Sequence, residues 1–226
     1  MKVNYCLPII KNTKQEVLSE LKTSGYDYYE IWLDYIEDFD EDFLMNITNK
    51  FKGKLILLFR RLDLEKIKFT IQERQRIISM LLRLVVYLDI DFLTQHEDLE
   101  FLKKQNGNIK LILSFHNYKE TPRLNCLVDL VSKMRNYNPD IYKFSTFCQN
   151  EEATLTLLSL LLKLKESKLK YIILGMGEKG VITRIVGPIW GNEISFAPKN
   201  LRESSARGQL NKKQLELILQ EVNYGR

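Results

Sequence analysis

The sequence is poor in the residues that build metal sites, disulfide frameworks and serine triads. It has three cysteines, Cys6, Cys126 and Cys148, and two histidines, His96 and His116. The odd number of cysteines and their wide spacing exclude a disulfide framework and a CxxC metal site, and their apolar contexts predict buried free thiols. With so few histidines and no His-x-x-x-His pattern, no metal centre is expected. A serine triad would lack its Gly-x-Ser-x-Gly turn.

Long apolar runs and blocks of like charge are also missing. No stretch approaches the roughly 18 apolar residues of a membrane span. The first ten residues do not resemble a signal peptide, so a cytoplasmic location is expected. The net charge of +5 comes from 34 basic and 29 acidic residues that are scattered along the chain. This distribution argues against nucleic acid and membrane as partners, and it suits a small anionic substrate.

What the sequence does have is a regular alternation of short apolar runs and amphipathic segments. Its 226 residues are 45% hydrophobic and 28% charged, as in a folded domain. The apolar runs predict eight strands, at 5–10, 28–35, 54–59, 85–92, 110–115, 140–146, 171–174 and 194–197. Helical spacing predicts helices at 14–23, 39–51, 71–84, 97–104, 121–136, 151–166 and 211–223, the first with a capping box of Thr13 and Glu16. A Gly-rich loop and a short apolar segment are expected over 175–189.

The spacing of these elements indicates the fold class. A strand-to-strand period of roughly 25–30 residues is typical of βα units in a parallel sheet. Eight such units predict an α/β fold, a (β/α)8 TIM barrel that forms a single compact domain over residues 1–226. A doubly wound open sheet is the alternative, but no Gly-rich phosphate turn follows Ile10. Gly175-x-Gly177-x-x-Gly180 has the letters of a dinucleotide motif but follows the seventh strand.

In a barrel of this kind the functional residues lie at the carboxyl ends of the strands. The polar residues at or near those ends are Glu30, Asp34, Arg60, Arg61, Asp89, Asp91, Ser114, His116, Lys143, Arg184, Ser204, Ser205 and Gln209. Together they suit a substrate with a ketone, a carboxylate and hydroxyl groups, because lysine forms imines with ketones and arginine binds carboxylates.

Lys143 is the candidate nucleophile, since it lies in the middle of an apolar strand. Burial disfavours the charged amine, and a partly neutral amine attacks carbonyls; the alternative is a lysine that reaches solvent from the strand end. His116 ends the neighbouring strand, where it could act as a general base or simply make a hydrogen bond. His96 lies among polar residues before a helix and is expected at the surface.

Seven segments, in order, resemble the type I 3-dehydroquinate dehydratases. The likeness runs from the first strand to the last loop and covers nearly the whole chain, and the combined order and spacing of the segments is more specific than any one of them. The segments are Glu30-Ile31-Trp32-Leu33-Asp34-Tyr35, Leu58-Phe59-Arg60, Tyr87-Leu88-Asp89-Ile90-Asp91, Ser114-Phe115-His116-Asn117-Tyr118 with Thr121-Pro122, Asp140-Ile141-Tyr142-Lys143, Met176-Gly177 with Gly180-Val181-Ile182-Thr183-Arg184, and Ala206-Arg207-Gly208-Gln209.

The resemblance implies a hydro-lyase of the shikimate pathway, which serves chorismate and aromatic amino acid biosynthesis. It implies that Lys143 forms an imine with the C3 ketone of 3-dehydroquinate. His116 would then remove the C2 proton and protonate the leaving C1 hydroxyl, so that syn elimination of water yields 3-dehydroshikimate. No metal or organic cofactor is implied, because the lysine supplies the covalent chemistry.

The resemblance also implies how the substrate is held. Arg184, Ser205 and Gln209 would bind the carboxylate, and Glu30 and Arg60 would bind the ring hydroxyls. Asp89, Met176 and Trp32 would have supporting positions, and the segment after the eighth strand would form a lid that excludes water. Family members are often dimers, but the sequence shows no heptad or apolar stripe that requires a homodimer.

Three departures from the family pattern keep other functions open. Trp32 stands where the family has an arginine that points into the pocket, and a missing hydrogen bond to a buried hydroxyl costs about 1–3 kcal/mol. Leu64 stands where a glutamate usually supports the catalytic histidine; its neighbours Asp63 and Glu65 could substitute if the loop shifts by one residue. Arg207 replaces a proline of the lid. The alternatives are a Schiff-base lyase for another cyclic keto acid, and a barrel with weak or lost activity that serves as a binding protein.

Overall fold

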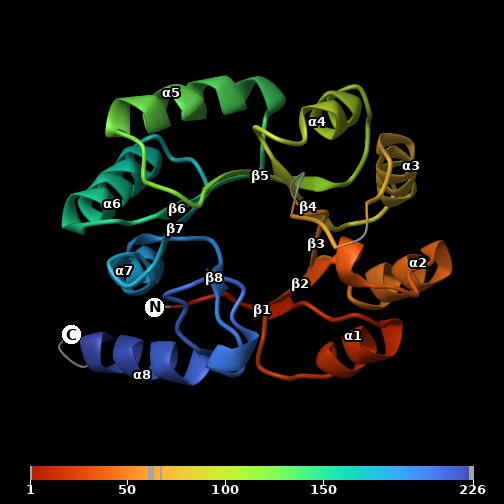
Figure 1. The fold of residues 1–226 in the computed structure, drawn as a ribbon, viewed down its shortest axis with the longest axis horizontal. Helices are drawn as coiled ribbons and strands as arrows, with labels where there is room; N and C mark the ends of the chain where they lie inside the picture. The colour runs from red at the N-terminus through yellow and green to blue at the C-terminus, as the bar shows by residue number, and fades with distance from the viewer. Residues whose placement is uncertain (1, 61–63, 67, 224–226) are drawn as a thin grey trace. The chain divides into compact units, whose positions relative to one another are not determined.

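Strands and helices alternate along the chain in a computed structural model that describes residues 2–60, 64–66 and 68–223 (Figure 1). The strands are β1 (Tyr5–Ile9), β2 (Tyr28–Trp32), β3 (Leu55–Leu58), β4 (Tyr87–Asp91), β5 (Lys110–Asn117), β6 (Ile141–Phe147), β7 (Tyr171–Met176) and β8 (Ser195–Phe196). The helices are α1 (Lys14–Glu20), α2 (Glu41–Lys50), α3 (Ile71–Leu81), α4 (His96–Lys103), α5 (Leu124–Met134), α6 (Glu151–Glu166), α7 (Val181–Trp190) and α8 (Lys212–Asn223). Short 3-10 turns lie at η1 (Leu33–Tyr35), η2 (Arg135–Tyr137) and η3 (Leu201–Glu203).

The chain divides into two compact units, one of residues 9–113 and one of residues 1–8 with 114–226. In the unit of residues 9–113, β2, β3 and β4 are parallel neighbours, with Trp32 opposite Leu58 and Leu58 opposite Asp89. Since alternate residues of a strand face the same side, Glu30, Trp32 and Asp89 share one face of these strands. The opposite face carries the fully buried side chains Ile31, Leu57 and Leu88.

Two helices of the same unit, α1 and α3, begin at side chains that satisfy their first backbone donors. The predicted capping box of Thr13 and Glu16 is present at α1, and a second one, of Thr70 and Glu73, starts α3. In each, the threonine hydroxyl accepts a backbone N–H and the glutamate accepts the backbone N–H of the threonine. Such caps stabilise short helices by about 1 kcal/mol.

The unit of residues 1–8 and 114–226 has two sets of parallel pairs. β6 pairs with β7, with Lys143 opposite Ile172 and Phe147 opposite Met176, and β1 pairs with β8, with Cys6 opposite Phe196. Helices α6 and α7 pack on β7 and on each other (Figure 1). The core between them contains fully buried leucine and isoleucine side chains, such as Leu161 and Ile173.

The structure corrects three predictions. The predicted strand 28–35 ends at Trp32, because its partner β3 ends at Leu58; beyond it, the Asp34 carboxylate accepts the backbone N–H of Arg60 (2.9 Å). The segment after Gly180 is the helix α7, which tolerates Pro188 in its last turn before Gly191 ends it. Cys126 lies on the exposed face of α5, so only Cys6 and Cys148 are buried thiols. Among the described residues, no helix is both long and apolar enough to span a membrane.

Candidate active site

Lys143 and His116 point from neighbouring strands to the same side. The rings of Phe115 in β5 and Phe144 in β6 contact each other at 6.0 Å between centroids, so these two side chains share one face. His116 and Lys143 are each one residue away along their strands and therefore both lie on the opposite face. Lys143 is 5% exposed and His116 is half-buried. The fold thus places an amine and an imidazole on the same face of two neighbouring strands, with His116 near the carboxyl end of β5 and Lys143 within β6.

Two aromatic rings lie next to this pair. The Nζ atom of Lys143 lies 4.5 Å from the centroid of the Phe196 ring, on β8. The imidazole of His116 stacks on Tyr118 at 6.2 Å, with 15° between the planes. Sequence reasoning assigned no role to either ring. Tyr118 follows His116 in a family segment and Phe196 ends the eighth strand, so position alone could have indicated both.

Arg184 is a buried cation in the same unit. It lies in the first turns of α7, is 5% exposed, and its Nε atom has no hydrogen-bond partner among the described residues. Burial lowers the pKa of Arg184 to about 10, with the nearby Cys148 sulfur as the opposing influence. The side chain therefore remains a cation at neutral pH, and no carboxylate pairs with it among the described residues. An anionic ligand would relieve the unfavourable free energy of burying that charge.

The start of α7, and with it Arg184, is fixed to the end of β7. The Thr183 hydroxyl accepts the backbone N–H of Gly175 and donates to the carbonyl of Gly180, both at 2.7 Å. Gly175 and Gly180 pack so closely that a Cβ on Gly175 would lie 2.6 Å from the Gly180 Cα. Gly175 and Gly180 therefore occur in a Gly-x-Gly-x-x-Gly pattern because their lack of side chains lets the end of β7 pack against the start of α7. The pattern does not require a dinucleotide.

The predicted lid docks on the loop that follows β7. Gly177 donates its N–H to the carbonyl of Arg207 (3.1 Å), and a Cβ on Gly208 would lie 2.4 Å from the Gly177 carbonyl oxygen. The Gln209 amide oxygen accepts the backbone N–H and the hydroxyl of Ser205, and its nitrogen donates to the Phe196 carbonyl. In this structure Gln209 therefore holds the loop in place.

In the unit of residues 9–113, one indole joins two of the predicted binding residues. The Trp32 Nε1 atom donates to the Glu30 carboxylate (3.1 Å), and the Arg60 guanidinium lies over the Trp32 ring with Cζ 4.1 Å from its centroid. Glu30 and Trp32 are buried, at 3% and 6% exposure. Tyr35 contacts the same indole edge-on. Asp89 is buried on the same face of the strands.

The Asp34 carboxyl lies close to this group. Burial raises its pKa, and the hydrogen bond from the Arg60 backbone opposes that shift. The second carboxylate oxygen of Asp34 and the Arg60 Nε atom are buried without a hydrogen-bond partner among the described residues. This part of the molecule therefore presents polar atoms that a hydroxylated ligand can satisfy.

The chain is similar to one known protein family over nearly its whole length. Residues 5–224 match the family described as type I 3-dehydroquinase. The chain is 34% identical over 215 residues to the 3-dehydroquinate dehydratase of Coxiella burnetii (strain CbuK_Q154), covering 93% of this chain and 90% of that protein. It is 30% identical over 225 residues to the same-named protein of Methanococcus maripaludis (strain C6), covering 96% and 99%. The chain belongs to the type I 3-dehydroquinase family.

Solved structures show the same fold. The 3-dehydroquinate dehydratase of Geobacillus kaustophilus HTA426 superimposes with a TM-score of 0.81 at 22% identity, covering 100% of this chain and 93% of that one. The type I enzyme of Clostridium difficile gives 0.79 at 22% identity, covering 100% and 94%. The predicted family, the predicted (β/α)8 barrel class and the predicted hydro-lyase class are confirmed.

Three positions at which this sequence differs from the 3-dehydroquinase family pattern, Trp32, Leu64 and Arg207, lie among the described residues. Trp32 is buried against Glu30 and Arg60. Leu64 is 39% exposed, and one carboxylate oxygen of Glu65 is buried without a hydrogen-bond partner among the described residues. Arg61 and Asp63 lie outside the described residues. Arg207 is exposed, and its backbone carbonyl accepts a hydrogen bond from the Gly177 N–H.

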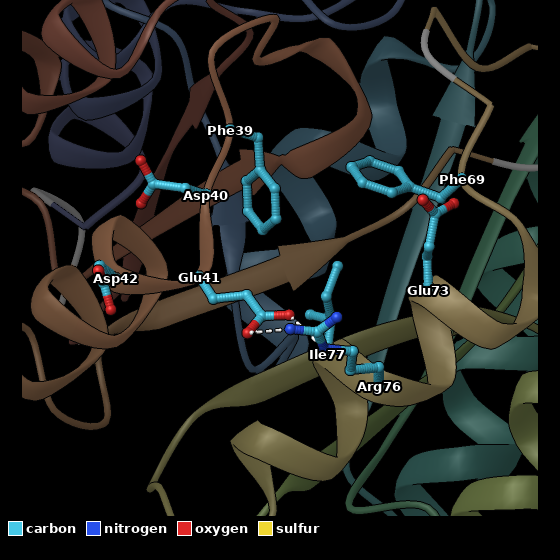
Figure 2. Close-up of a pocket in the computed structure, with 8 residues that line it drawn as sticks. All are labelled: Phe39, Asp40, Glu41, Asp42, Phe69, Glu73, Arg76 and Ile77. Carbon is cyan, nitrogen blue, oxygen red and sulfur yellow. Dashed lines mark hydrogen bonds and ion pairs between the residues drawn. The ribbon is translucent and has the colours of Figure 1, made fainter.

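A pocket of about 450 Å³ lies between the starts of α2 and α3, in the unit of residues 9–113. Figure 2 shows its lining of two phenylalanines, four carboxylates, Arg76 and Ile77. Three of the carboxylates already have structural partners: Asp40 caps α2 and bonds Lys14, Glu41 pairs with Arg76 (2.7 Å), and Glu73 belongs to the α3 capping box. Among the described residues, no group of three or more His, Cys, Asp or Glu could hold a metal ion.

Proposed function

We propose that this chain removes water from 3-dehydroquinate to give 3-dehydroshikimate, in the shikimate pathway, with Lys143 as the Schiff-base residue. The amine attacks the C3 ketone and expels water to form a protonated imine. That imine withdraws electrons, so the C2 hydrogen becomes acidic. His116 takes the C2 proton and returns a proton to the C1 hydroxyl, which leaves as water by syn elimination. Hydrolysis of the imine restores the lysine and releases the product.

The observation that carries this proposal is the buried amine of Lys143 with His116 on the same face of the neighbouring strand. A lysine in an apolar strand loses much of its hydration, which favours the neutral nucleophile. Phe196, 4.5 Å from the amine, contributes an apolar wall that limits water around the imine. The neighbouring imidazole can both accept and donate a proton, as the elimination requires.

Arg184 supplies the proposed site for the substrate carboxylate. Its buried cation lacks a protein carboxylate among the described residues, and a guanidinium binds a carboxylate through two parallel hydrogen bonds. Ser205 and Gln209 are proposed to assist through the lid that they hold together. Glu30 and Arg60 are proposed to bind the hydroxyl groups of the substrate ring. Asp89, Met176 and Trp32 are proposed as supporting residues. The single catalytic domain, the homodimer and the cytoplasmic location stay predictions.

The test is turnover. Purified protein mixed with 3-dehydroquinate should produce the ultraviolet absorbance of the conjugated enone product, and a Lys143→Met variant should produce none. Lack of enone formation by the wild-type protein refutes the proposed reaction. If sodium borohydride then still links a cyclic keto acid to Lys143, the chain is a Schiff-base enzyme for another substrate. If it links none, the barrel is a binding protein.

A further inference from the structure

We propose that Trp32 is a positioning residue that organises Glu30 and Arg60 into one binding site for substrate hydroxyls. This inference rests on the proposed function. It gives a role to a residue that, from the sequence alone, only removes the arginine that the family has at this position. Its basis is that one indole contacts both side chains, and that it does so through two different parts of the ring system.

The edge of the indole holds the carboxylate. Trp32 and Glu30 are two residues apart on β2, so their side chains lie on the same face. The Trp32 N–H donates to Glu30 Oε2 at 3.1 Å, and both residues are nearly inaccessible to solvent. A buried carboxylate needs donors that do not move. An indole has one donor at a fixed place on a rigid ring, so it fixes where the carboxylate points.

The face of the indole holds the cation. The Arg60 guanidinium lies over the ring with Cζ 4.1 Å from the centroid, which is within the range of a cation–π contact. Tyr35 packs edge-on against the same indole at 5.2 Å and fixes its plane. The backbone N–H of Arg60 is bound by Asp34, so the main chain is held as well.

The result is an acceptor and a donor placed beside each other by one ring. A hydroxyl group donates to a carboxylate and accepts from a guanidinium, so the pair suits a polyhydroxylated ring. The buried Arg60 Nε atom has no hydrogen-bond partner among the described residues, which leaves a donor for such a ligand. Trp32 need not touch the substrate itself, because its effect passes through Glu30 and Arg60.

The first experiment is a double-mutant cycle in steady-state kinetics with 3-dehydroquinate. Trp32→Phe removes the N–H and keeps a ring; it should raise KM roughly 10-fold while kcat changes by less than about threefold, because a hydrogen bond to a charged group is lost away from the reacting carbon. Glu30→Ala should raise KM as well. The double variant should be little worse than Glu30→Ala alone, because the two residues act through one contact. Trp190→Phe, at the other tryptophan, is the matched control and should leave KM unchanged.

The outcomes separate the two claims. An inactive wild-type protein refutes the proposed function, and with it this role of Trp32. An active wild-type protein with an unchanged KM in Trp32→Phe, or fully additive effects in the cycle, refutes the role of Trp32 alone.

A second measurement tests the role of Trp32 without the Trp32→Phe variant, so it can be made even if that variant fails to fold. In the Trp190→Phe variant Trp32 is the only tryptophan, and quinate serves as a hydroxylated probe that has no ketone to react. A saturable change in Trp32 emission on adding quinate, lost in Glu30→Ala, supports the inference. No saturable change overturns it.

Discussion

Replacing Arg184 should make the protein more stable and less able to bind its substrate. The Arg184 cation is buried, its Nε atom has no partner among the described residues, and burial lowers its pKa from the ordinary arginine value to about 10. That shift corresponds to about 3 kcal/mol against the charged folded state. Arg184→Met removes the charge and keeps an unbranched side chain, so the free energy of unfolding at pH 7 should rise by up to about 3 kcal/mol, less any lost packing.

The sign of this effect depends on pH. Because the folded pKa lies below the unfolded one, the free-energy penalty is fully present below about pH 10 and fades as pH rises above about 10. The advantage of Arg184→Met over the wild-type protein should therefore be constant from pH 6 to 9. The same variant should lose the carboxylate site, so KM should rise at least roughly 10-fold.

Arg74 provides the matched control. It is also buried, at 8% exposure, but its Nε atom pairs with Asp98 Oδ2 at 2.6 Å. Burial raises the pKa of Asp98, and Arg74 opposes that shift. Arg74→Met would leave the carboxylate without its partner, so it should destabilise the protein by about 3–5 kcal/mol.

Urea unfolding followed by circular dichroism compares these variants, with equal m values as the check that one transition is measured. The reasoning predicts opposite signs for Arg184→Met and Arg74→Met. If Arg184→Met is destabilised as strongly as Arg74→Met, Arg184 has a partner within the protein and is not a vacant anion site.

Two further predictions concern chemistry and the lid. His116→Ala should lower kcat by roughly 10²–10⁴-fold, as for other general bases, yet still form the borohydride adduct at Lys143; an unchanged rate would contradict its role in proton transfer. Gly208→Ala should raise KM, because Gly208 has φ +78° and an added Cβ would lie 2.4 Å from the Gly177 carbonyl. Gly53→Ala, at φ +73° with its nearest neighbour 3.7 Å away, is the control and should cost only stability; equal effects on KM would rule out the lid contact.

Local sequence patterns predicted most of the elements because each pattern has a local physical cause. The helix at 151–166 has the predicted bounds, and the Thr13 capping box forms as its spacing requires. The helix α7 was missed because Gly180 and Pro188 resemble loop residues, whereas Thr183 ties its first turn to β7 and Pro188 falls in the last turn. A proline there removes only one backbone bond.

Contacts of the site residues were harder to predict than their positions. Lys143, His116 and Arg184 could be found from strand order and family segments. The partners of Trp32 depend on the direction of an indole side chain and on the register of β2 against β3, which no single-sequence pattern specifies. For the same reason the sequence indicated only that Trp32 replaces an arginine of the family and removes a positive charge. The structure shows that its ring contacts both Glu30 and Arg60.

Reductive trapping of the imine tests the central claim most directly. The protein is mixed with 3-dehydroquinate and sodium borohydride, weighed by mass spectrometry and digested to locate the adduct. The account predicts a gain on the peptide that contains Lys143, equal to the mass of the substrate, or of its dehydration product, less one oxygen atom. Lys143→Met should gain nothing, and Lys170→Met, at an exposed lysine, should react like the wild-type protein. No adduct on the wild-type protein, or an adduct on another lysine, would contradict it.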